Sequence, residues 1–499
     1  MVVRSTDFGA LLIYIGRISV KVSNFLLSLA LASACAAISL NLTARAEGQT
    51  YTDFANFDGT NGSGSDAPLI QATDGNFYGA SGADTFGTIF RVTPSGEITA
   101  IYKFCSQPDC ADGDDPIWNP VLGSDGNLYG VAESGGSYAG SKSGSGTFYK
   151  TTLDGQMTIL HAFCPATPCP DGQYPNGVVL GSDGNFYGTT YAGGKSNKGV
   201  IFKVSSTGEI TVLYSFCSLA NCKDGAGPIT PPIQASNGNI YGVTNEGEGV
   251  LYELTPSGTY TVLHDFCSVD GCKDGFQAST PVQGANGNIY GTTVEGGSEG
   301  HGLVYEVTAT SQYVVLDNFD YLRGSPFAGL ALANDGNFYG TTIGPSTVEN
   351  GGTIFEVTPE GRYTQLYTFT ECSSSGYNPF ASVFQGTNGV LYGVTLYGGS
   401  DTFDGGCGGY GTIFTLSNGL RPLVETVPVA GPIGQSVLIL GNNLTGSSSV
   451  TFNGVAAAFT VESDTYIKAT VPDGASSGVV SVVTPTGTLK SNPRFVVNK

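Results

Sequence analysis

One short phrase, Asp-Gly-Asn-Phe-Tyr-Gly or a close variant, occurs seven times along this chain. The Asn of the phrase is replaced by Val in the last copy, and the seven positions are Asn76, Asn127, Asn185, Asn239, Asn288, Asn337 and Val390. The steps between copies are 51, 58, 54, 49, 49 and 53 residues. Because a single four-stranded sheet cannot bury both of its faces, repeats of this length predict the blades of a propeller. The chain is therefore predicted to be all-β, with a seven-bladed β-propeller.

The third repeat shows how one blade is expected to form. Its apolar segments at 177–180, 186–190, 199–204 and 209–216 are separated by turns rich in Gly, Asn and Ser. The last segment alternates apolar and polar residues, which indicates a strand with one face better buried than the other. Four strands joined in sequence form a meander, so each repeat is predicted to be a four-stranded blade.

Loop lengths distinguish the two faces of the predicted ring. The first and third turns of each repeat are short, whereas the second loops and the loops between repeats are long, Gly-rich and hold the cysteines of the repeats. Functional residues concentrate on loops that a rigid scaffold carries, so the long-loop face is the candidate working face. The last repeat has three strands, ending near 411–416, and residues 49–57 resemble a fourth strand. The N-terminus is therefore predicted to close blade 7 and remove its open edge.

The first 46 residues have the pattern of a secretory signal peptide. Arg4, Arg17 and Lys21 precede an apolar run at 25–40, which ends at the small-residue segment 44–46. The run is short for a membrane span, so we expect cleavage after Ala46 and no transmembrane segment in the mature chain. This predicts a secreted or cell-surface protein. A lipoprotein attached through Cys35 is the alternative mode of attachment.

The net charge of the chain limits the classes of binding partner that are expected. The formal net charge is −21, and residues 1–46 carry four positive charges and one negative charge, so their removal leaves −24. Such an acidic surface repels nucleic acid and anionic lipid, and nucleic-acid binding is not expected. Cationic partners remain compatible with this charge. No cofactor is expected, with Ca²⁺ as the one alternative.

Ten of the eleven cysteines lie beyond residue 46. Eight share the spacing C-x4-C, and an even count in an exported chain favours disulfides, here with a further long-range pair. The predicted pairs are Cys105 with Cys110, Cys164 with Cys169, Cys217 with Cys222, Cys267 with Cys272, and Cys372 with Cys407. Zinc binding is the rival interpretation, but each short pair belongs to a different repeat and the chain has only three histidines.

From about residue 420 the repeats stop, and short β runs separated by Gly, Asn and Pro turns predict a small β-sandwich. The segments 431–437, 441–444, 450–454 and 471–478 resemble an IPT/TIG domain. This resemblance implies an immunoglobulin-like module of extracellular proteins, which acts as a spacer or an adhesive unit and has no catalytic role.

The repeats themselves resemble the GloVer tandem repeat (Gloeobacter/Verrucomicrobia type) of bacterial exported proteins. The matching text includes residues 183–190 and 352–359, and the likeness covers nearly all of 50–418. That family carries no catalytic signature to transfer. The expected organisation is a signal peptide at 1–46, a propeller at 47–419 and an IPT/TIG domain at 420–499.

Candidate ligand-binding residues lie in the loops between repeats. Asp-Gly follows the second cysteine of each short pair, and one aromatic residue follows it in three of these loops; the candidates are Asp112, Asp114, Asp115, Trp118, Asp171, Tyr174, Asp224, Asp274 and Phe276. The carboxylates suit Ca²⁺, a cationic ligand or sugar chemistry, but an Asp before Gly also caps a turn. The aromatic rings suit stacking on sugar faces, or they fill gaps between blades. His161 and His264 are expected to be packing residues, and His301 lies in a loop.

These features favour a non-enzymatic binding or adhesion protein that recognises a glycan or another surface ligand through the long-loop face. No catalytic residue is assigned, because no Ser/His/Asp arrangement is evident. Two alternatives remain open: an extracellular carbohydrate-active enzyme, a lyase or hydrolase that uses the rim carboxylates, and a structural component of the cell envelope.

Overall fold

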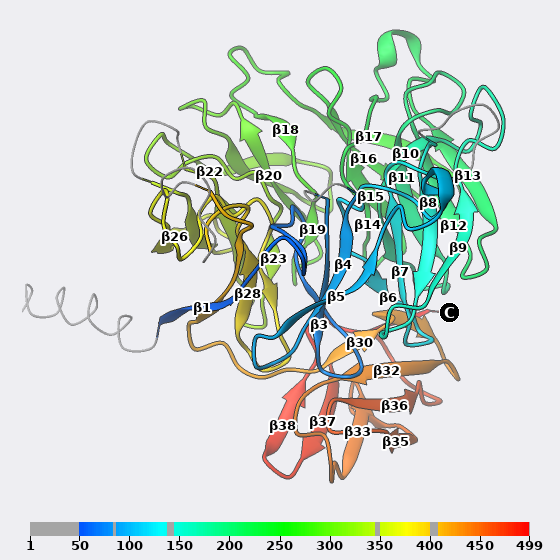
Figure 1. The fold of residues 1–499 in the computed structure, drawn as a ribbon, viewed down its shortest axis with the longest axis vertical. Coiled ribbons are helices and arrows are strands. Elements are labelled where there is room, and N and C mark those ends of the chain that lie inside the picture. Colours follow the sequence, from blue (N-terminus) through cyan, green and yellow to red (C-terminus); the bar gives the residue numbers. More distant parts are fainter. Residues whose placement is uncertain (1–48, 83–85, 137–143, 345–349, 400–407, 499) are drawn as a thin grey trace, which may run out of the picture. The chain divides into compact units, whose positions relative to one another are not determined.

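The computed structural model describes residues 49–82, 86–136, 144–344, 350–399 and 408–498 (Figure 1). The predicted signal peptide and Cys35 lie outside these residues. The regular elements of the described part are all β-strands except for two short 3-10 turns, η1 (Pro108–Cys110) and η2 (Ala220–Cys222). None of its helices is long and apolar enough to cross a membrane.

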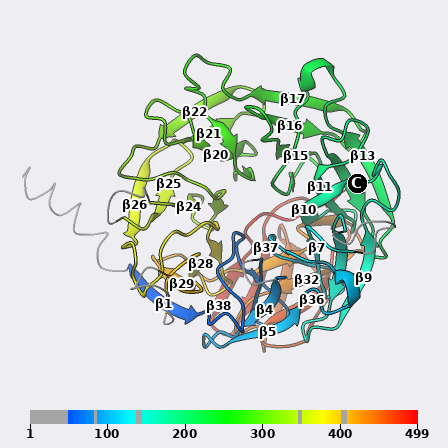
Figure 2. The same cartoon turned by 45° about the horizontal axis from the view of Figure 1, so that its top comes forward.

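Seven antiparallel sheets, here called blades 1 to 7, are arranged in a ring (Figure 2). In each blade the first strand lies nearest the centre of the ring and the fourth lies at its periphery. The strands of the first four blades are β2 (Ile70–Gln71), β3 (Phe77–Ser81), β4 (Thr88–Val92) and β5 (Ile98–Lys103); β6 (Val121–Leu122), β7 (Leu128–Ala132), β8 (Thr147–Thr151) and β9 (Met157–Ala162); β10 (Gln173–Leu180), β11 (Phe186–Ala192), β12 (Val200–Val204) and β13 (Ile210–Ser215); β14 (Ile233–Gln234), β15 (Ile240–Val243), β16 (Val250–Leu254) and β17 (Tyr260–Asp265).

The remaining three blades complete the ring, and blade 5 differs in that its first strand is broken into two segments. Their strands are β18 (Phe276–Ala278), β19 (Val282–Gln283), β20 (Ile289–Glu295), β21 (Leu303–Val307) and β22 (Tyr313–Asn318); β23 (Ala331–Leu332), β24 (Phe338–Thr342), β25 (Thr353–Val357) and β26 (Tyr363–Thr368); β27 (Phe384–Gln385), β28 (Leu391–Val394), β29 (Thr412–Ser417) and β1 (Thr50–Asn56). The predicted seven-bladed propeller is confirmed.

The repeated phrase owes its composition to the hairpin between the first two strands and to the packing behind it. In blade 3 Asp183 Oδ1 accepts a hydrogen bond from the backbone N–H of Asn185 at 3.1 Å, and Gly184 between them has φ +78°. Such a left-handed position favours glycine. The last residue of the phrase, Gly188, is glycine for a different reason, since a Cβ there would collide with the ring of Phe202 on the next strand.

The tyrosine of the phrase closes each hairpin through a carboxylate in blades 1 to 6, whereas in blade 7 the Tyr392 hydroxyl accepts from the amide of Asn388. In blades 1, 2, 3 and 6 its hydroxyl donates to the Asp of the turn, as Tyr129 does to Asp125 at 2.9 Å. Asn replaces this Asp in blade 4, where Tyr241 instead donates to Glu253 of the third strand at 2.6 Å. Blade 5 repeats the arrangement of blade 4 with Tyr290 and Glu306. The tyrosines are thus structural, as their regular spacing indicates.

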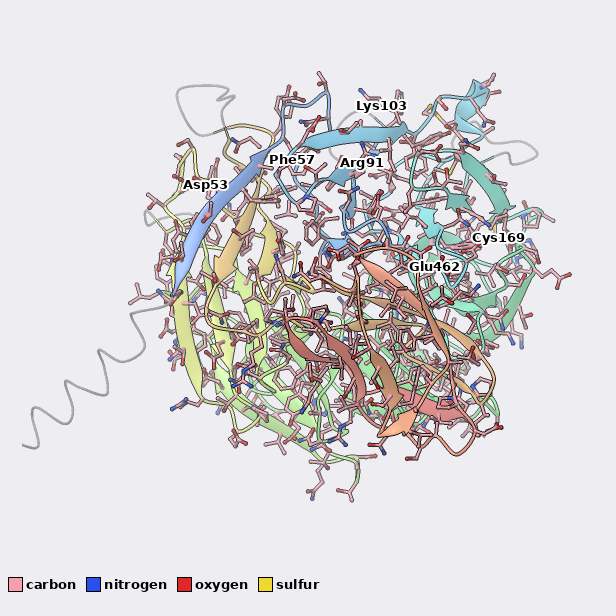
Figure 3. All side chains as sticks on the ribbon, turned by 90° about the horizontal axis from the view of Figure 1, so that it is seen from below. Asp53, Phe57, Arg91, Lys103, Cys169 and Glu462 are labelled. Atoms are coloured by element: carbon pink, nitrogen blue, oxygen red, sulfur yellow. A yellow bond between two sulfur atoms is a disulfide. The ribbon has the colours of Figure 1, made fainter. Side chains whose placement is uncertain are left out.

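The N-terminal strand closes the ring, as predicted. β1 pairs with β29 antiparallel from Thr50 and Ser417 to Asn56 and Thr412, and so supplies the fourth strand of blade 7. The ring of Tyr51 stacks on that of Tyr367 in blade 6, with centroids 3.9 Å apart, and its hydroxyl donates to the carbonyl of Ser375 at 2.8 Å. Figure 3 labels Asp53 on this strand, which runs along the outer edge of the propeller. No blade therefore keeps an unpaired third strand.

Two further four-stranded sheets form the C-terminal β-sandwich, with an additional parallel pair at its side. Its core is a cluster of buried apolar residues that includes Val437, Ile439, Val450, Ile467 and Val482. The strands are β30 (Glu425–Val427), β32 (Ser436–Leu440), β36 (Tyr466–Thr470) and β35 (Phe459–Val461); β34 (Val455–Ala456), β33 (Ser449–Phe452), β37 (Val480–Thr484) and β38 (Gly487–Lys490); and the pair β31 (Ala430–Pro432) and β39 (Val496–Asn498).

The sandwich packs against the face of the propeller that carries the short hairpins. Val427, Leu438 and Leu440 form one apolar cluster with Tyr78 and Leu128 of blades 1 and 2. Hydrogen bonds extend this contact: Thr465 Oγ1 donates to the carbonyl of Thr73 at 2.6 Å, and Asn492 Nδ2 donates to that of Leu332 at 3.1 Å. The long-loop face lies at the other end of each blade and is not covered by the sandwich.

Candidate functional site

The four short cysteine pairs form the predicted disulfides, each within the loop that links one blade to the next. Cys372 is also disulfide-bonded, and its expected partner Cys407 lies outside the described residues. Oxidised cysteines cannot act as thiolate ligands, and the described residues contain no group of three or more potential metal ligands. The structure therefore does not support the zinc interpretation.

The Asp that follows each of these pairs is a structural cap of its own loop. Asp224 Oδ2 accepts hydrogen bonds from the backbone N–H of Ser218 at 2.7 Å and from the hydroxyl of Tyr214 at 2.6 Å, while Oδ1 accepts from the N–H of Leu219 at 3.0 Å. The equivalent residues are placed alike, and all four are buried: Asp112 (0% exposed), Asp171 (7%), Asp224 (0%) and Asp274 (4%).

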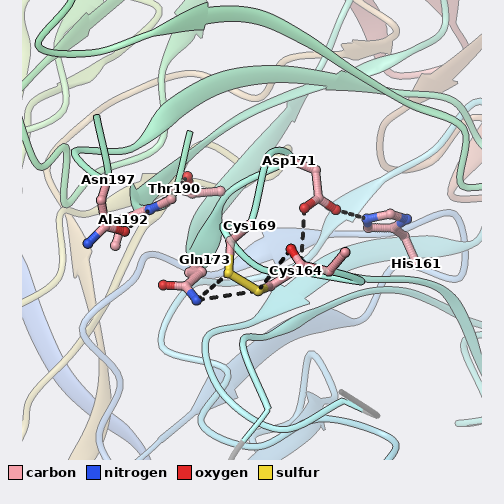
Figure 4. Close-up of a disulfide and its surroundings, with 10 residues drawn as sticks. His161, Cys164, Cys169, Asp171, Gln173, Thr190, Ala192 and Asn197 are labelled. Carbon is pink, nitrogen blue, oxygen red and sulfur yellow. Dashed lines mark hydrogen bonds and ion pairs between the residues drawn. A yellow bond between two sulfur atoms is a disulfide. The ribbon is translucent and has the colours of Figure 1, made fainter. Parts of the chain in front are cut away.

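Figure 4 shows the second of these caps, in the loop between blades 2 and 3, where Asp171 Oδ2 lies 2.7 Å from His161 Nε2. Its Oδ1 accepts a hydrogen bond from the backbone N–H of Cys164. The fourth-strand residue is Tyr102 or Tyr214 in two loops and His161 or His264 in the other two, always ten residues before the Asp. These histidines are therefore partners of the caps as well as packing residues.

These contacts account for the titration behaviour of the loops. Burial alone would raise the pKa of Asp112, but hydrogen bonds from Tyr102, Ser106 and Gln107 lower it below the ordinary value. Burial and the hydrogen bond to Asp112 raise the pKa of Tyr102 to about 12. Burial lowers the pKa of His264, and the nearby Asp274 carboxylate only partly opposes this effect. The four buried carboxylates serve their loops and do not form a ring of free ligands, contrary to the functional interpretation of Asp112, Asp171, Asp224 and Asp274.

A hollow, here called the channel cavity, lies where the seven blades converge, and its volume is about 820 Å³. Every blade lines it with residues just before or within its first strand, and Tyr191, Asn245, Glu246 and Val294 add residues at or just after the far end of second strands. Large apolar side chains dominate the wall: Ile117, Trp118, Tyr191, Ile229, Phe327 and Phe380. Ile229 is 44% exposed and Phe327 is 45% exposed, although both are large hydrophobic residues.

Among the aromatic candidates, the structure places only Trp118 in the wall of this cavity. Trp118 lies three residues before β6 and six after Asp112. Tyr174 lies on β10 and Phe276 on β18, each closer in sequence to its Asp than Trp118 is. Neither of them is among the residues that line the cavity. Phe276 packs instead against the core between blades 4 and 5.

A weaker signal in the sequence marks this cavity. In four repeats a proline precedes a large apolar residue at the same register before the first strand: Pro116-Ile117, Pro228-Ile229, Pro326-Phe327 and Pro379-Phe380. All four apolar residues line the cavity. Their positions can be found by counting back from each first strand, but this signal is weaker than the repeated aspartates and aromatic residues beside the cysteines.

The cavity wall is negatively charged. Asp66 and Glu246 are its charged residues, and Glu246 forms an ion pair with Lys198. The surrounding wall desolvates Asp66 and so raises its pKa. Behind it, desolvation and the charges of Asp114 and Asp66 raise the pKa of Asp115, and desolvation and the Asp115 charge raise that of Glu133. The carboxylates of Asp114 and Asp115 form no ion pair with a described residue.

Several solved structures resemble this chain at low similarity. An oligogalacturonate lyase from Vibrio parahaemolyticus is 11% identical, covers 74% of this chain and 97% of its own, and has a TM-score of 0.46. A PQQ-bound aldose sugar dehydrogenase from Streptomyces coelicolor is 13% identical, with coverages of 74% and 98% and a TM-score of 0.38. A luciferin-regenerating enzyme is 12% identical, with coverages of 75% and 98% and a TM-score of 0.40. None of these similarities bears on activity.

No protein of curated function matches the chain. The Gloeobacter/Verrucomicrobia repeat matches residues 42–168, 111–274 and 248–427, and the IPT/TIG domain matches residues 423–497. Both resemblances drawn from the sequence are thus confirmed, over the propeller and the sandwich respectively. The chain belongs to the Gloeobacter/Verrucomicrobia repeat family and carries an IPT/TIG domain at its C-terminus.

Proposed function

We propose that this protein is a non-enzymatic binding protein of the cell exterior, and that its ligand occupies the channel cavity. The observation that carries the proposal is the cavity itself, about 820 Å³ in volume and lined mainly by apolar side chains from all seven blades. Ligand sites are commonly hollows of roughly 300–1,000 Å³ with apolar walls and a few polar groups. Large apolar residues at the surface of such a hollow cost free energy that a bound partner recovers.

The proposed location outside the cytosol is supported by the four disulfides and by the IPT/TIG domain. Disulfides of this number are typical of proteins that fold in an oxidising compartment. The sandwich covers the short-hairpin face, and this leaves the long-loop face for a partner.

The carboxylates support binding more than catalysis. The enzyme alternative relied on rim carboxylates, and four of them are buried caps that hydrogen-bond their own loops. Within the cavity wall Glu246 is held in an ion pair with Lys198, which leaves Asp66 without a second free carboxylate among the lining residues. Glycoside hydrolysis commonly needs two carboxylates in defined positions.

A glycan is the second candidate ligand, and one feature favours it. Trp118 and Tyr191 both line the cavity, and aromatic rings of this kind stack on the apolar faces of sugars.

The test uses the fluorescence of Trp118, which is the sole tryptophan of the chain and lies in the cavity wall. The full chain is titrated with soluble apolar compounds and with a set of oligosaccharides. We expect a saturable change in emission, and Phe327→Ala should weaken binding about tenfold because it removes a large apolar contact.

Phe86→Ala is the matched control, since Phe86 is also 45% exposed but does not line the cavity. Equal affinity in both variants would place the ligand elsewhere. Release of new reducing ends from a polysaccharide would overturn the non-enzymatic assignment.

A further inference from the structure

The charged groups of the channel cavity are of one sign. Among the described residues, Asp66 and Glu246 are the ionisable groups of the wall besides Tyr191, and no described lysine, arginine or histidine lines it. Since Lys198 neutralises Glu246, the uncompensated charge is that of Asp66. Asp66 lies in the cavity wall and makes no hydrogen bond or ion pair with another described residue.

Further carboxylates lie behind Asp66, between blades 1 and 2. Asp115 is close enough to Asp66 to feel its charge, Asp114 is its chain neighbour, and the backbone N–H of Glu133 donates to the carbonyl of Asp115 at 3.0 Å. None of these four carboxylates forms an ion pair with a described residue. Their mutual repulsion is a cost that a cation in the cavity would relieve.

Resting on the proposed binding function, we propose that the channel cavity selects a ligand that joins an apolar body to a cationic group, with the cation beside Asp66. The apolar body contacts Ile229, Phe327 and the other hydrophobic residues of the wall. The cation is an ammonium or guanidinium group, which pairs with the carboxylate of Asp66. The faces of Trp118 and Tyr191 add attraction for such a group, because aromatic rings bind cations.

The test compares three probes with the same n-hexyl body: hexylammonium, hexanol and hexanoate. Each is titrated into the full chain at pH 7.5 while the emission of Trp118 is followed. We expect hexylammonium to bind about tenfold more tightly than hexanol, and hexanoate more weakly than both. Added salt should reduce the advantage of hexylammonium and leave hexanol unaffected.

Asp66→Asn should abolish the advantage of hexylammonium while it leaves the affinity for hexanol within about twofold. Asp473→Asn removes the same charge from an exposed site on the sandwich and should change neither. Equal binding of hexylammonium and hexanol to the unmodified protein would refute the cation preference and leave the cavity as a ligand site. Absence of binding by either probe would refute both the preference and the apolar site on which it rests.

Discussion

Tyr214 donates its hydroxyl hydrogen to Asp224 Oδ2 over 2.6 Å, and so ties the outermost strand of blade 3 to the cysteine loop that follows it. Three other repeats build the same link between partners ten positions apart in sequence, using Tyr or His on the strand. The link explains why Asp-Gly follows each short cysteine pair. It also explains why the sequence pattern looked like a ring of ligands.

Asp224→Ala should lower the free energy of unfolding by about 3 kcal/mol, because it leaves two backbone N–H groups and the Tyr214 hydroxyl without their buried acceptor. Denaturant unfolding of the oxidised protein measures this loss. Lys223→Ala changes the exposed neighbouring residue and should have little effect. A loss for Asp224→Ala no larger than that for Lys223→Ala would show that the cap contributes little.

The stability of the protein should depend on His264 near neutral pH. Burial lowers the pKa of this residue in the folded state below the value of about 6.5 expected when unfolded. The unfolded state then binds the proton more readily, so stability is lost as the pH falls below about 6.5 and the loss levels off below the folded pKa. Asp274, Asp265 and Tyr313 surround the ring, and the two carboxylates limit the size of the effect.

The comparison that isolates this effect is His264→Tyr, because tyrosine occupies the same position at Tyr102 and Tyr214. The difference in unfolding free energy between the two proteins should grow in favour of the variant between pH 7 and pH 5. A difference that is constant over this range would mean that His264 does not titrate on unfolding.

Tyr51→Ala should destabilise the protein by roughly 3–4 kcal/mol, because it removes the stacking on Tyr367 and the hydrogen bond to Ser375 at the seam of the ring. Thermal unfolding should show this as a lower midpoint. Tyr321→Ala serves as the control, since Tyr321 is 39% exposed and lies outside the seam. A similar shift in both variants would contradict the role assigned to β1.

Asn237 and Glu253 at the hairpin of blade 4 should be replaceable by the Asp and Lys that occupy the same positions in blade 2. Asn237→Asp adds a carboxylate beside Tyr241 and Glu253 and should cost about 1 kcal/mol through repulsion. The double variant Asn237→Asp/Glu253→Lys reproduces the pair Asp125 and Lys150, whose charged atoms lie 2.7 Å apart, and should recover most of that loss. Denaturant unfolding of both single variants and the double variant gives the coupling. Additive effects would show that the two positions do not interact.

Much of the fold could be read from local chemistry. The turn residues Asp183 and Gly184 fix a hairpin through their own backbone preferences, and the same phrase in seven copies fixes the number of blades. The strand at Thr50–Asn56 could be assigned to blade 7 because its pattern matched the strand missing there. Each of these inferences depends on residues that are close in sequence or on a repeated count.

The candidate site was harder to predict, because its residues are far apart in sequence and their directions depend on packing. Asp171 and Trp118 both looked like loop residues that could reach a ligand. The Asp171 side chain turns inward to the N–H of Cys164 and to His161, whereas Trp118 lies in the cavity wall. Ile229 and Phe327 carry only the weak signal of a preceding proline, and nothing in the local sequence distinguishes Asp66.

The amino-acid sequence by itself determined the all-β class, the seven sheets, the closing strand, the oxidised cysteine pairs and the sandwich at the C-terminus. Turn chemistry, periodicity and repeat spacing are sufficient for these, because each acts over a few residues or recurs at a constant interval. The tertiary structure alone decided which loop residues became caps and which apolar residues met at the centre. That choice depends on the closure of the ring, which brings segments about fifty residues apart to one cavity and turns each side chain toward its loop or toward the channel.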